Sequence, residues 1–91
     1  MAKVSVIVPV FNAGAHLSEC LGNLVNQTLS DIELIFVNDA STDNSLDILF
    51  ECEMQYRSRV IVIDCAVNAG PGGARNIGVS YAGGDYVGFV D

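Results

Sequence analysis

The chain has 91 residues, of which 51% are hydrophobic and 16% charged, and its formal net charge is −7 at pH 7. This length suits one domain with a single core, and so apolar a composition is typical of a parallel sheet buried on both faces. The negative charge excludes a basic nucleic-acid-binding face, and no apolar stretch reaches the roughly 20 residues that cross a bilayer, so we expect a cytoplasmic protein, with membrane association left open for a longer parent.

Four short runs rich in Val, Ile and Phe predict β-strands, because they are apolar, brief and bounded by polar or turn-forming residues. They begin at intervals of 26 to 29 residues. The four runs are Val4–Val10, Glu33–Val37, Val60–Ile63 and Tyr86–Val90. Regular spacing of this kind leaves room for one helix between each pair of strands.

Segments with helical spacing of apolar residues lie between the predicted strands. Their apolar positions are Leu17, Leu21 and Leu24, then Leu46, Leu49, Phe50 and Met54, and, more weakly, Ala74, Ile77, Val79 and Tyr81. Helix-start signals support them, because Ser41 to Asn44 precede the second segment and Pro71 suits the first turn of the third. The order β-α-β-α-β-α-β predicts an α/β, Rossmann-like fold with a parallel sheet, truncated after the fourth strand.

In open α/β sheets, ligands bind beyond the carboxyl ends of the strands, so the loops after the predicted strands are the candidate site. These loops are Pro9–Gly14, Asn38–Asn44, Asp64–Gly73 and whatever follows Asp91. The first loop has neither the Gly-x-Gly-x-x-Gly of dinucleotide-binding folds nor the Gly-Lys-Ser/Thr of P-loops. The two commonest phosphate-binding explanations of an α/β fold are therefore excluded.

Two side chains at these strand ends suit a nucleobase. The ring of Phe11 offers a flat apolar face, with Pro9 shaping the turn, although the same ring could instead cap the core. Asp39 can accept an N–H from a base or serve the turn that follows it. Ser41 and Asp43 are better explained as caps of the next helix.

The third and fourth strand ends offer groups for an anion and a cation. Gly70 permits close approach of the backbone, and Arg75 follows it at a predicted helix N-terminus, where anions are stabilised. Arg75 can pair with a phosphate, hold a carboxylate such as Asp39, or form only a structural salt bridge. Asp91 ends a buried strand and carries the oxygen ligands that divalent cations prefer, whereas Asp85 belongs to the preceding turn.

The cysteines and the histidine add no site. Cys20, Cys52 and Cys65 form no Cys-x-x-Cys pair and leave one cysteine over, which predicts reduced, mostly buried thiols rather than disulfides or a zinc site. His16 falls in the first helical segment, where we expect it to be exposed or half-buried.

Four motifs follow one another at the predicted strand ends, and they are the segments Val4 to Asn12, Asn38 to Asp43, Asn68 to Asn76 and Gly84 to Asp91. In this order they resemble the large family 2 of inverting glycosyltransferases, which have the GT-A fold. The resemblance covers the whole chain. It implies that residues 1–91 are the nucleotide-sugar-binding half of a GT-A domain whose acceptor half is absent.

By this resemblance six residues bind the nucleotide, namely Pro9, Phe11, Asn12, Asp39, Gly70 and Arg75. Phe11 would lie in the base-binding loop, Asp39 would accept a hydrogen bond from the base, and Arg75 would lie near the base and the diphosphate. Asp91 would open an Asp-x-Asp motif that holds Mg²⁺ or Mn²⁺ together with the nucleotide-diphosphate sugar. The implied reaction moves a sugar, from a UDP-sugar by preference, to a hydroxyl of a saccharide or lipid-linked acceptor in cell wall or polysaccharide biosynthesis.

The chain departs from the family pattern, because it lacks the second aspartate of Asp-x-Asp, the acceptor-binding half and the later catalytic aspartate. No catalytic residue is therefore assigned within it. We expect these 91 residues alone to bind nucleotide weakly and to transfer no sugar. We also expect self-association, because the missing half would leave an apolar sheet edge exposed.

The alternative function is a non-catalytic nucleotide- or protein-binding module derived from such a domain, in which Asp39 and Arg75 serve only stability. An aspartate two positions after Asp91 would favour the enzyme. A dehydrogenase is disfavoured because the glycine loop is missing, and a response-regulator receiver because the first strand ends without acids. The donor sugar, the nucleotide and the acceptor stay open.

Overall fold

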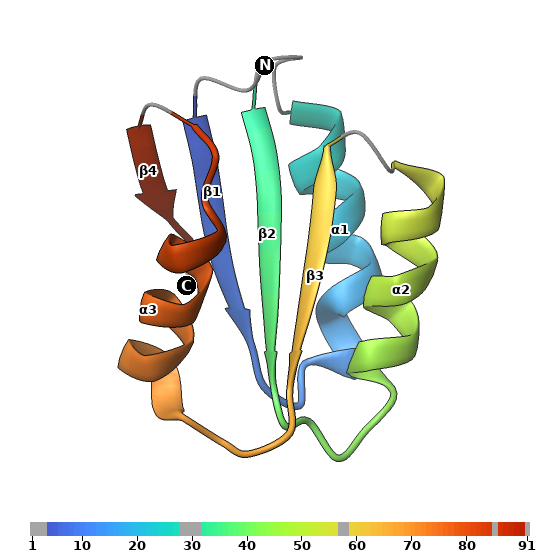
Figure 1. Cartoon of the computed structure of the whole chain (residues 1–91). Helices are drawn as coiled ribbons and strands as arrows, with labels where there is room; N and C mark the ends of the chain where they lie inside the picture. Colours follow the sequence, from blue (N-terminus) through green and yellow to red (C-terminus); the bar gives the residue numbers. More distant parts are fainter. Residues whose placement is uncertain (1–3, 28–31, 57–58, 85, 91) are drawn as a thin grey trace.

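The computed structural model describes residues 4–27, 32–56, 59–84 and 86–90. Its elements are β1 (Val4–Val10), α1 (Gly14–Gln27), β2 (Ile32–Asp39), α2 (Ser45–Gln55), β3 (Val60–Cys65), α3 (Gly70–Tyr81) and β4 (Tyr86–Phe89). The strands form a parallel sheet in the order β3-β2-β1-β4, with α1 and α2 on one face and α3 on the other (Figure 1). The predicted α/β, Rossmann-like class and the order of elements are confirmed.

Two strands are longer than predicted. β2 runs from Ile32 to Asp39 and β3 runs to Cys65, whereas β4 ends at Phe89, one residue before the predicted end. The extra residues pair across the sheet, since Asp39 lies opposite Cys65 in the parallel register. Hydropathy gave the wrong boundaries because ladder hydrogen bonds continue into polar strand ends that a hydropathy pattern assigns to loops. Asp39 is therefore a strand residue, with the orientation of its side chain set by the sheet.

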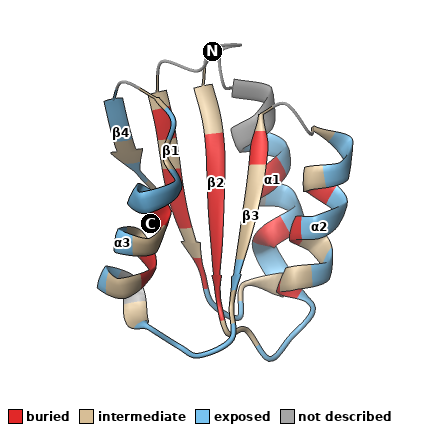
Figure 2. Ribbon diagram, in the orientation of Figure 1, coloured by how far each residue is buried: buried red, intermediate tan, exposed pale blue. Residues whose placement is uncertain are grey.

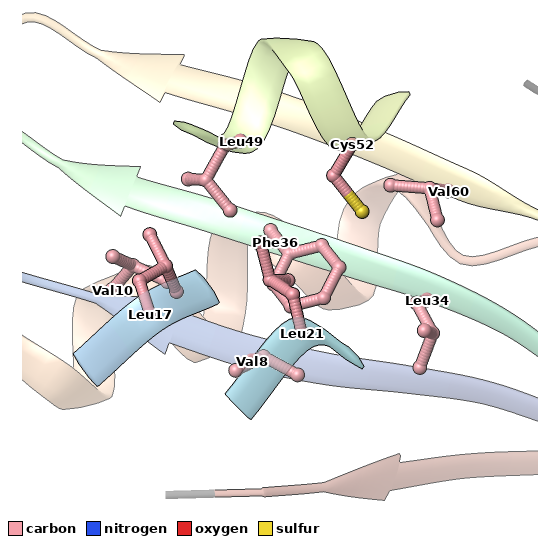
Figure 3. Close-up of a cluster of buried hydrophobic side chains, with 9 residues drawn as sticks. All are labelled: Val8, Val10, Leu17, Leu21, Leu34, Phe36, Leu49, Cys52 and Val60. Atoms are coloured by element: carbon pink, nitrogen blue, oxygen red, sulfur yellow. The ribbon is translucent and has the colours of Figure 1, made fainter. Parts of the chain in front are cut away.

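The larger core lies between the sheet and the helices α1 and α2 (Figure 3). Its buried members are Val8, Val10, Leu17, Leu21, Leu34, Phe36, Leu49, Cys52 and Val60. β2 is buried along most of its length, because helices cover both faces of the sheet where it lies (Figure 2). Such double burial explains why residues Leu34 to Val37 form a continuous apolar run and do not alternate with polar residues. Each fully buried large side chain contributes roughly 1.5–3 kcal/mol to stability.

The smaller core lies on the opposite face, where α3 covers β1 and β2. Ile7, Ile35, Val37 and Ala74 are buried there. Gly78 lets the helix come close, because a Cβ at this position would stand 2.5 Å from Cγ2 of Ile7 and 3.2 Å from Cγ2 of Val37. The distance between α3 and the sheet therefore depends on this glycine.

Hydrogen bonds at the amino end of the sheet determine where β4 joins it. The hydroxyl of Ser5, which is buried, donates to Oε2 of Glu33 at 2.5 Å and accepts the amide of Gly84 at 2.9 Å. The same Glu33 oxygen accepts the amide of Gly83 at 2.8 Å. A Cβ at Gly84 would lie 2.8 Å from the backbone nitrogen of Ser5, so this close approach requires glycine. The turn at Gly83 and Gly84 therefore aligns β4 with β1.

The two edges of the sheet differ. At β3, Oε2 of Glu53 accepts the backbone N–H of Val62 at 2.8 Å, which satisfies a donor on the outer side of the edge strand. At β4, the side chains of Tyr86, Val87 and Phe89 are exposed. The expected self-association through an apolar sheet edge stays a prediction.

The histidine and the cysteines can be compared with what the sequence predicted for them. His16 is exposed on α1. Cys52 and Cys65 are free thiols, and burial raises the pKa of both, most plainly for Cys52 in the larger core. The side chain of Cys20 lies outside the described part of the structure. None of the helices in the described ranges has the length and apolar character that a bilayer span requires.

Gly78→Ala is expected to lower the free energy of unfolding by about 1–3 kcal/mol, because the added methyl group overpacks the contact with Ile7. This loss should outweigh the gain of about 1 kcal/mol in helix propensity. Gly22→Ala on α1 is the matched control, since nothing lies within 4 Å of a Cβ there. Urea denaturation measures both variants. Stabilisation by both would show that α3 can move away from the sheet without cost.

Candidate functional site

The carboxyl ends of β1, β2 and β3 meet at one edge of the sheet, and the loops that lead to α1, α2 and α3 lie close together there (Figure 1). Asn12 and Ala40 have φ angles of 49° and 58°, and Gly70 has 75°. For Ala40 this left-handed backbone costs roughly 1–2 kcal/mol, which surrounding contacts must offset. Strain of this kind is concentrated at binding and catalytic sites, so these loops are the first place to look for function.

Side-chain hydrogen bonds join the first loop to the second. Oδ1 of Asn12 accepts the amide of Thr42 at 2.7 Å, and the amide of Asn12 donates to Oγ of Ser41 at 3.0 Å. The amide of Ala13 donates to Oγ of Ser45, also at 3.0 Å. Asn12, which was predicted to bind nucleotide, therefore connects two loops in this structure.

Asp43 caps two helices at once. Its Oδ1 accepts the amide of Ser45 at 2.9 Å and the Ser45 hydroxyl at 2.6 Å, and its Oδ2 accepts the amide of Gly14 at 3.0 Å. These are the first residues of α2 and α1, whose N–H groups have no partner within their helices. The bonds, with the Ser45 hydroxyl first, lower the pKa of Asp43 below its ordinary value of 3.8. The predicted capping role of Asp43 is confirmed, whereas Ser41 binds the first loop instead.

Asp39 is the last residue of β2, and only 3% of it is exposed. Its Oδ1 accepts the amide of Ala69 at 2.6 Å, and its Oδ2 accepts the amide of Gly70 at 3.0 Å. Ala69 is the N-cap of α3 and makes no side-chain cap of its own, so a carboxylate from another strand takes that place. The positive end of the helix dipole favours this negative charge.

Asn68 completes the group around Asp39. Its Nδ2 donates to the backbone carbonyl of Asp39 at 3.2 Å, and its Oδ1 accepts the amide of Gly70 at 3.0 Å. The N-terminus of this helix was expected to stabilise an anion, and two amides there, of Ala69 and Gly70, already bind the carboxylate of Asp39. An anionic ligand at this edge therefore has to draw on other donors.

A pocket of about 580 Å³ lies beside this group, within the range of small-molecule sites. Its lining residues are Pro9, Val10, Phe11, Asp39, Asn68, Gly70 and Arg75. Five of the six residues predicted to bind nucleotide thus line one pocket. The sixth, Asn12, is not among its lining residues. Nucleotide binding by these residues stays a prediction. Val10 and Asn68 also line the pocket but were not predicted as nucleotide-binding residues, although Asn68 belongs to a segment that carried part of the resemblance to the family.

The pocket combines a flat apolar group with a cation. Phe11 is 55% exposed, which favours a ring open to a ligand over a ring that caps the core. The guanidinium carbon of Arg75 lies 6.0 Å from the centroid of the Phe89 ring on β4, within cation–π range. An exposed ring, a buried carboxylate and a guanidinium suit a ligand that is flat at one end and anionic at the other.

The predicted metal ligand, Asp91, lies outside the described residues, as does Asp85. Among residues 4–27, 32–56, 59–84 and 86–90, no three His, Cys, Asp or Glu side chains gather closely enough to hold a metal ion. A carboxylate at position 91 has the oxygen ligands that Mg²⁺ and Mn²⁺ prefer. The metal site is therefore not part of the geometry described above.

Comparison with known proteins gives consistent matches. The family model for glycosyl transferase family 2 matches residues 5–91. A poly(ribitol-phosphate) beta-glucosyltransferase of Bacillus spizizenii is 48% identical over 92 residues, which make up 98% of this chain and 14% of that protein. The crystal structure of S. aureus TarS 1-349 in complex with UDP has a TM-score of 0.83 and 36% identity, over 98% of this chain and 27% of that one. The chain therefore spans a small part of the length of these relatives.

Asp39→Ala is expected to lower the free energy of unfolding by about 2–3 kcal/mol without any ligand present, because two amides at the start of α3 lose a charged acceptor. Asp47→Ala is the control, since Asp47 is exposed in the first turn of α2. It should cost no more than about 1 kcal/mol. Urea denaturation compares the two, and equal effects would mean that other contacts hold the start of α3.

Stability is also expected to fall in acid because of Asp43. Its pKa is lower in the folded chain than in the unfolded chain, so its stabilisation is complete above the ordinary value of 3.8 and is lost as the pH falls below that value. Asp43→Asn should therefore lose less stability than the wild type between about pH 5 and pH 3. Urea midpoints at several pH values test this, and parallel curves would contradict it.

Proposed function

The chain belongs to glycosyl transferase family 2, and from this premise we propose that residues 1–91 form the nucleotide-sugar-binding half of an inverting transferase. Its donor would be a UDP-sugar and its acceptor a hydroxyl group. The observation that carries the proposal is that Phe11, Asp39 and Arg75 line the same pocket at the carboxyl ends of the strands. The activity of the whole protein is part of the proposal, because the chain covers only 14% of one relative and 27% of another.

In this proposal Phe11 stacks on the nucleobase. Phe11 is 55% exposed and lines the pocket, and Pro9, which also lines it, limits the conformations of the loop. Stacking of a base on an aromatic side chain contributes about 1–3 kcal/mol. Asn12 would contribute indirectly, because its bond to Thr42 holds the loop that carries Phe11.

Asp39 would read the edge of the base. An ionised carboxylate has about four acceptor positions, and the amides of Ala69 and Gly70 take two of them. A remaining position can accept the imide N–H of uracil. The two amides also hold the carboxylate in one orientation, so little freedom is lost when a base binds. A base without such an N–H could not form this hydrogen bond and should bind more weakly.

Arg75 would bind the diphosphate. The chain carries a net charge of −7, so long-range attraction does not favour an anionic ligand, and a local cation has to supply the binding energy. A guanidinium can form paired hydrogen bonds with phosphate oxygens. Gly70 at the pocket wall would allow the ligand to approach the backbone closely.

The proposed UDP preference is supported by relatives rather than by the pocket alone. S. aureus TarS 1-349, which is 36% identical over the matched region, has been crystallised with UDP and with UDP-GlcNAc. We propose the same nucleotide class here. A poly(ribitol-phosphate) beta-glucosyltransferase among the relatives favours an acceptor in the cell wall or polysaccharide class, either a saccharide or a lipid-linked polymer.

A divalent cation, Mg²⁺ or Mn²⁺, is proposed at Asp91. Such an ion would neutralise charge on the diphosphate leaving group. The catalytic base that deprotonates the acceptor hydroxyl would lie outside these 91 residues, since no described residue is assigned that role. We therefore propose that the chain by itself binds nucleotide weakly and transfers no sugar.

A non-catalytic binding module is the second candidate, and the capping role of Asp39 favours it. The carboxylate is fully explained by stability if its only partners are the amides of α3. The same ambiguity makes Asp39→Ala a poor probe of nucleotide binding, because the variant would lose stability in either case. A test of function needs a pocket residue that contributes little to folding.

Phe11→Ala is expected to weaken UDP binding by about tenfold or more, because the base loses its stacking partner. Phe50→Ala is the matched control, since Phe50 is 42% exposed on α2 and does not line the pocket. Amide NMR titrations with UDP, GDP and dTDP, with and without Mn²⁺, give the affinities. Equal affinities for Phe11→Ala and the wild type, or no UDP-dependent shifts in a folded wild-type chain, would contradict the proposed function.

A further inference from the structure

We propose that Phe89 of β4 is a positioning residue that orients the guanidinium of Arg75 toward the diphosphate end of the pocket. Phe89 does not line the pocket and no motif assigned it a role. The inference rests on the proposed function, because it takes the pocket to bind a nucleoside diphosphate. It adds a contribution of β4 to phosphate recognition.

The fold places Phe89 under Arg75. In the parallel register of β1 and β4, Phe89 lies opposite Ile7, so both side chains project from the same face of the sheet. Ile7 belongs to the core beneath α3 and meets the helix at Gly78. Arg75 precedes Gly78 by three residues and so lies on the same side of the helix, one turn nearer its N-terminus. The guanidinium carbon consequently lies 6.0 Å from the centroid of the Phe89 ring.

This contact suits a phosphate-binding arginine. An arginine side chain has large rotational freedom, and binding a phosphate requires that freedom to be lost. A ring that attracts the guanidinium through its π face reduces that loss before the ligand arrives. A cation–π contact can use the flat face of a guanidinium, which leaves the N–H groups at its edge to bind phosphate oxygens. Phe89 is half-exposed, so its ring contributes little to the buried core.

The position of β4 becomes part of the same arrangement. Glu33 and Ser5 hold the Gly83-Gly84 turn, and this turn sets where β4 starts along β1. The position of Phe89 along β1, and hence relative to α3, is therefore fixed. Tyr86, on the same strand, is also an exposed aromatic residue, but it pairs with Val4 at the far end of the strand from the pocket.

The test measures the affinity of the chain for UDP and for uridine in Phe89→Leu, which keeps an apolar side chain but removes the ring. We expect UDP to bind about three- to fivefold more weakly than in the wild type, with uridine unchanged, because only the diphosphate contacts Arg75. Phe89→Tyr, which keeps a ring, should retain the UDP affinity. Tyr86→Leu, the control on the same strand, should leave both affinities unchanged.

A double-mutant cycle makes the mechanism explicit. In an Arg75→Gln background, Phe89→Leu should cause no further loss of UDP affinity, because its effect passes through Arg75. The Nε–H resonance of Arg75 should also show a ring-current shift in the wild type that Phe89→Leu removes, and this readout needs no ligand. Equal losses for UDP and uridine, additive losses in the double variant, or an unshifted resonance would each overturn the inference. If the wild type binds neither UDP nor uridine, the proposed function fails, and the inference fails with it.

Discussion

The carboxylate of Asp39 and the two amides that start α3 form the interaction on which the rest of the pocket depends. β2 is an inner strand between β3 and β1, and its last residue, Asp39, is held by pairing with Cys65 of β3. The Asp39 carboxylate accepts the amides of Ala69 and Gly70, and these bonds fix the start of α3 relative to β2. One buried charge thereby sets the start of the helix that carries Arg75, and it also keeps a hydrogen-bond acceptor at the pocket wall.

Local geometry, rather than overall charge, decides what this edge of the sheet can bind. A chain with a net charge of −7 repels anions at long range, and the helix terminus that would usually attract one is neutralised by Asp39. Arg75 is the basic residue among those that line the pocket. Binding of a diphosphate therefore requires an oriented guanidinium and, in our proposal, a cation near Asp91. This requirement explains why the contact between Arg75 and Phe89 matters.

The candidate site was predictable to the extent that strand ends were predictable. Phe11 and Asp39 stand at the ends of apolar strands, and Arg75 lies in the first half of the helix after the next strand. Parallel strands bring such positions to one edge. The role of Asn12 was not predictable, because its bond to Thr42 joins residues 30 positions apart. The capping of α3 by Asp39 was not predictable for the same reason, since a sequence pattern reveals helix caps only when they are local. Phe89 likewise acquires its neighbour through the pairing of β4 with β1.

The sequence by itself determined the α/β class, the order of the elements and the capping of α2 by Asp43, because periodicity and local cap residues act over a few positions. Tertiary structure alone decided the strand boundaries, the partners of Asp39 and the distance between α3 and the sheet. Each of these depends on atoms far apart in the chain, such as Gly78 against Ile7 and Gly84 against Ser5. Local sequence propensity carries no information about such contacts, because they form only when the strands have paired and the helices have packed on the sheet.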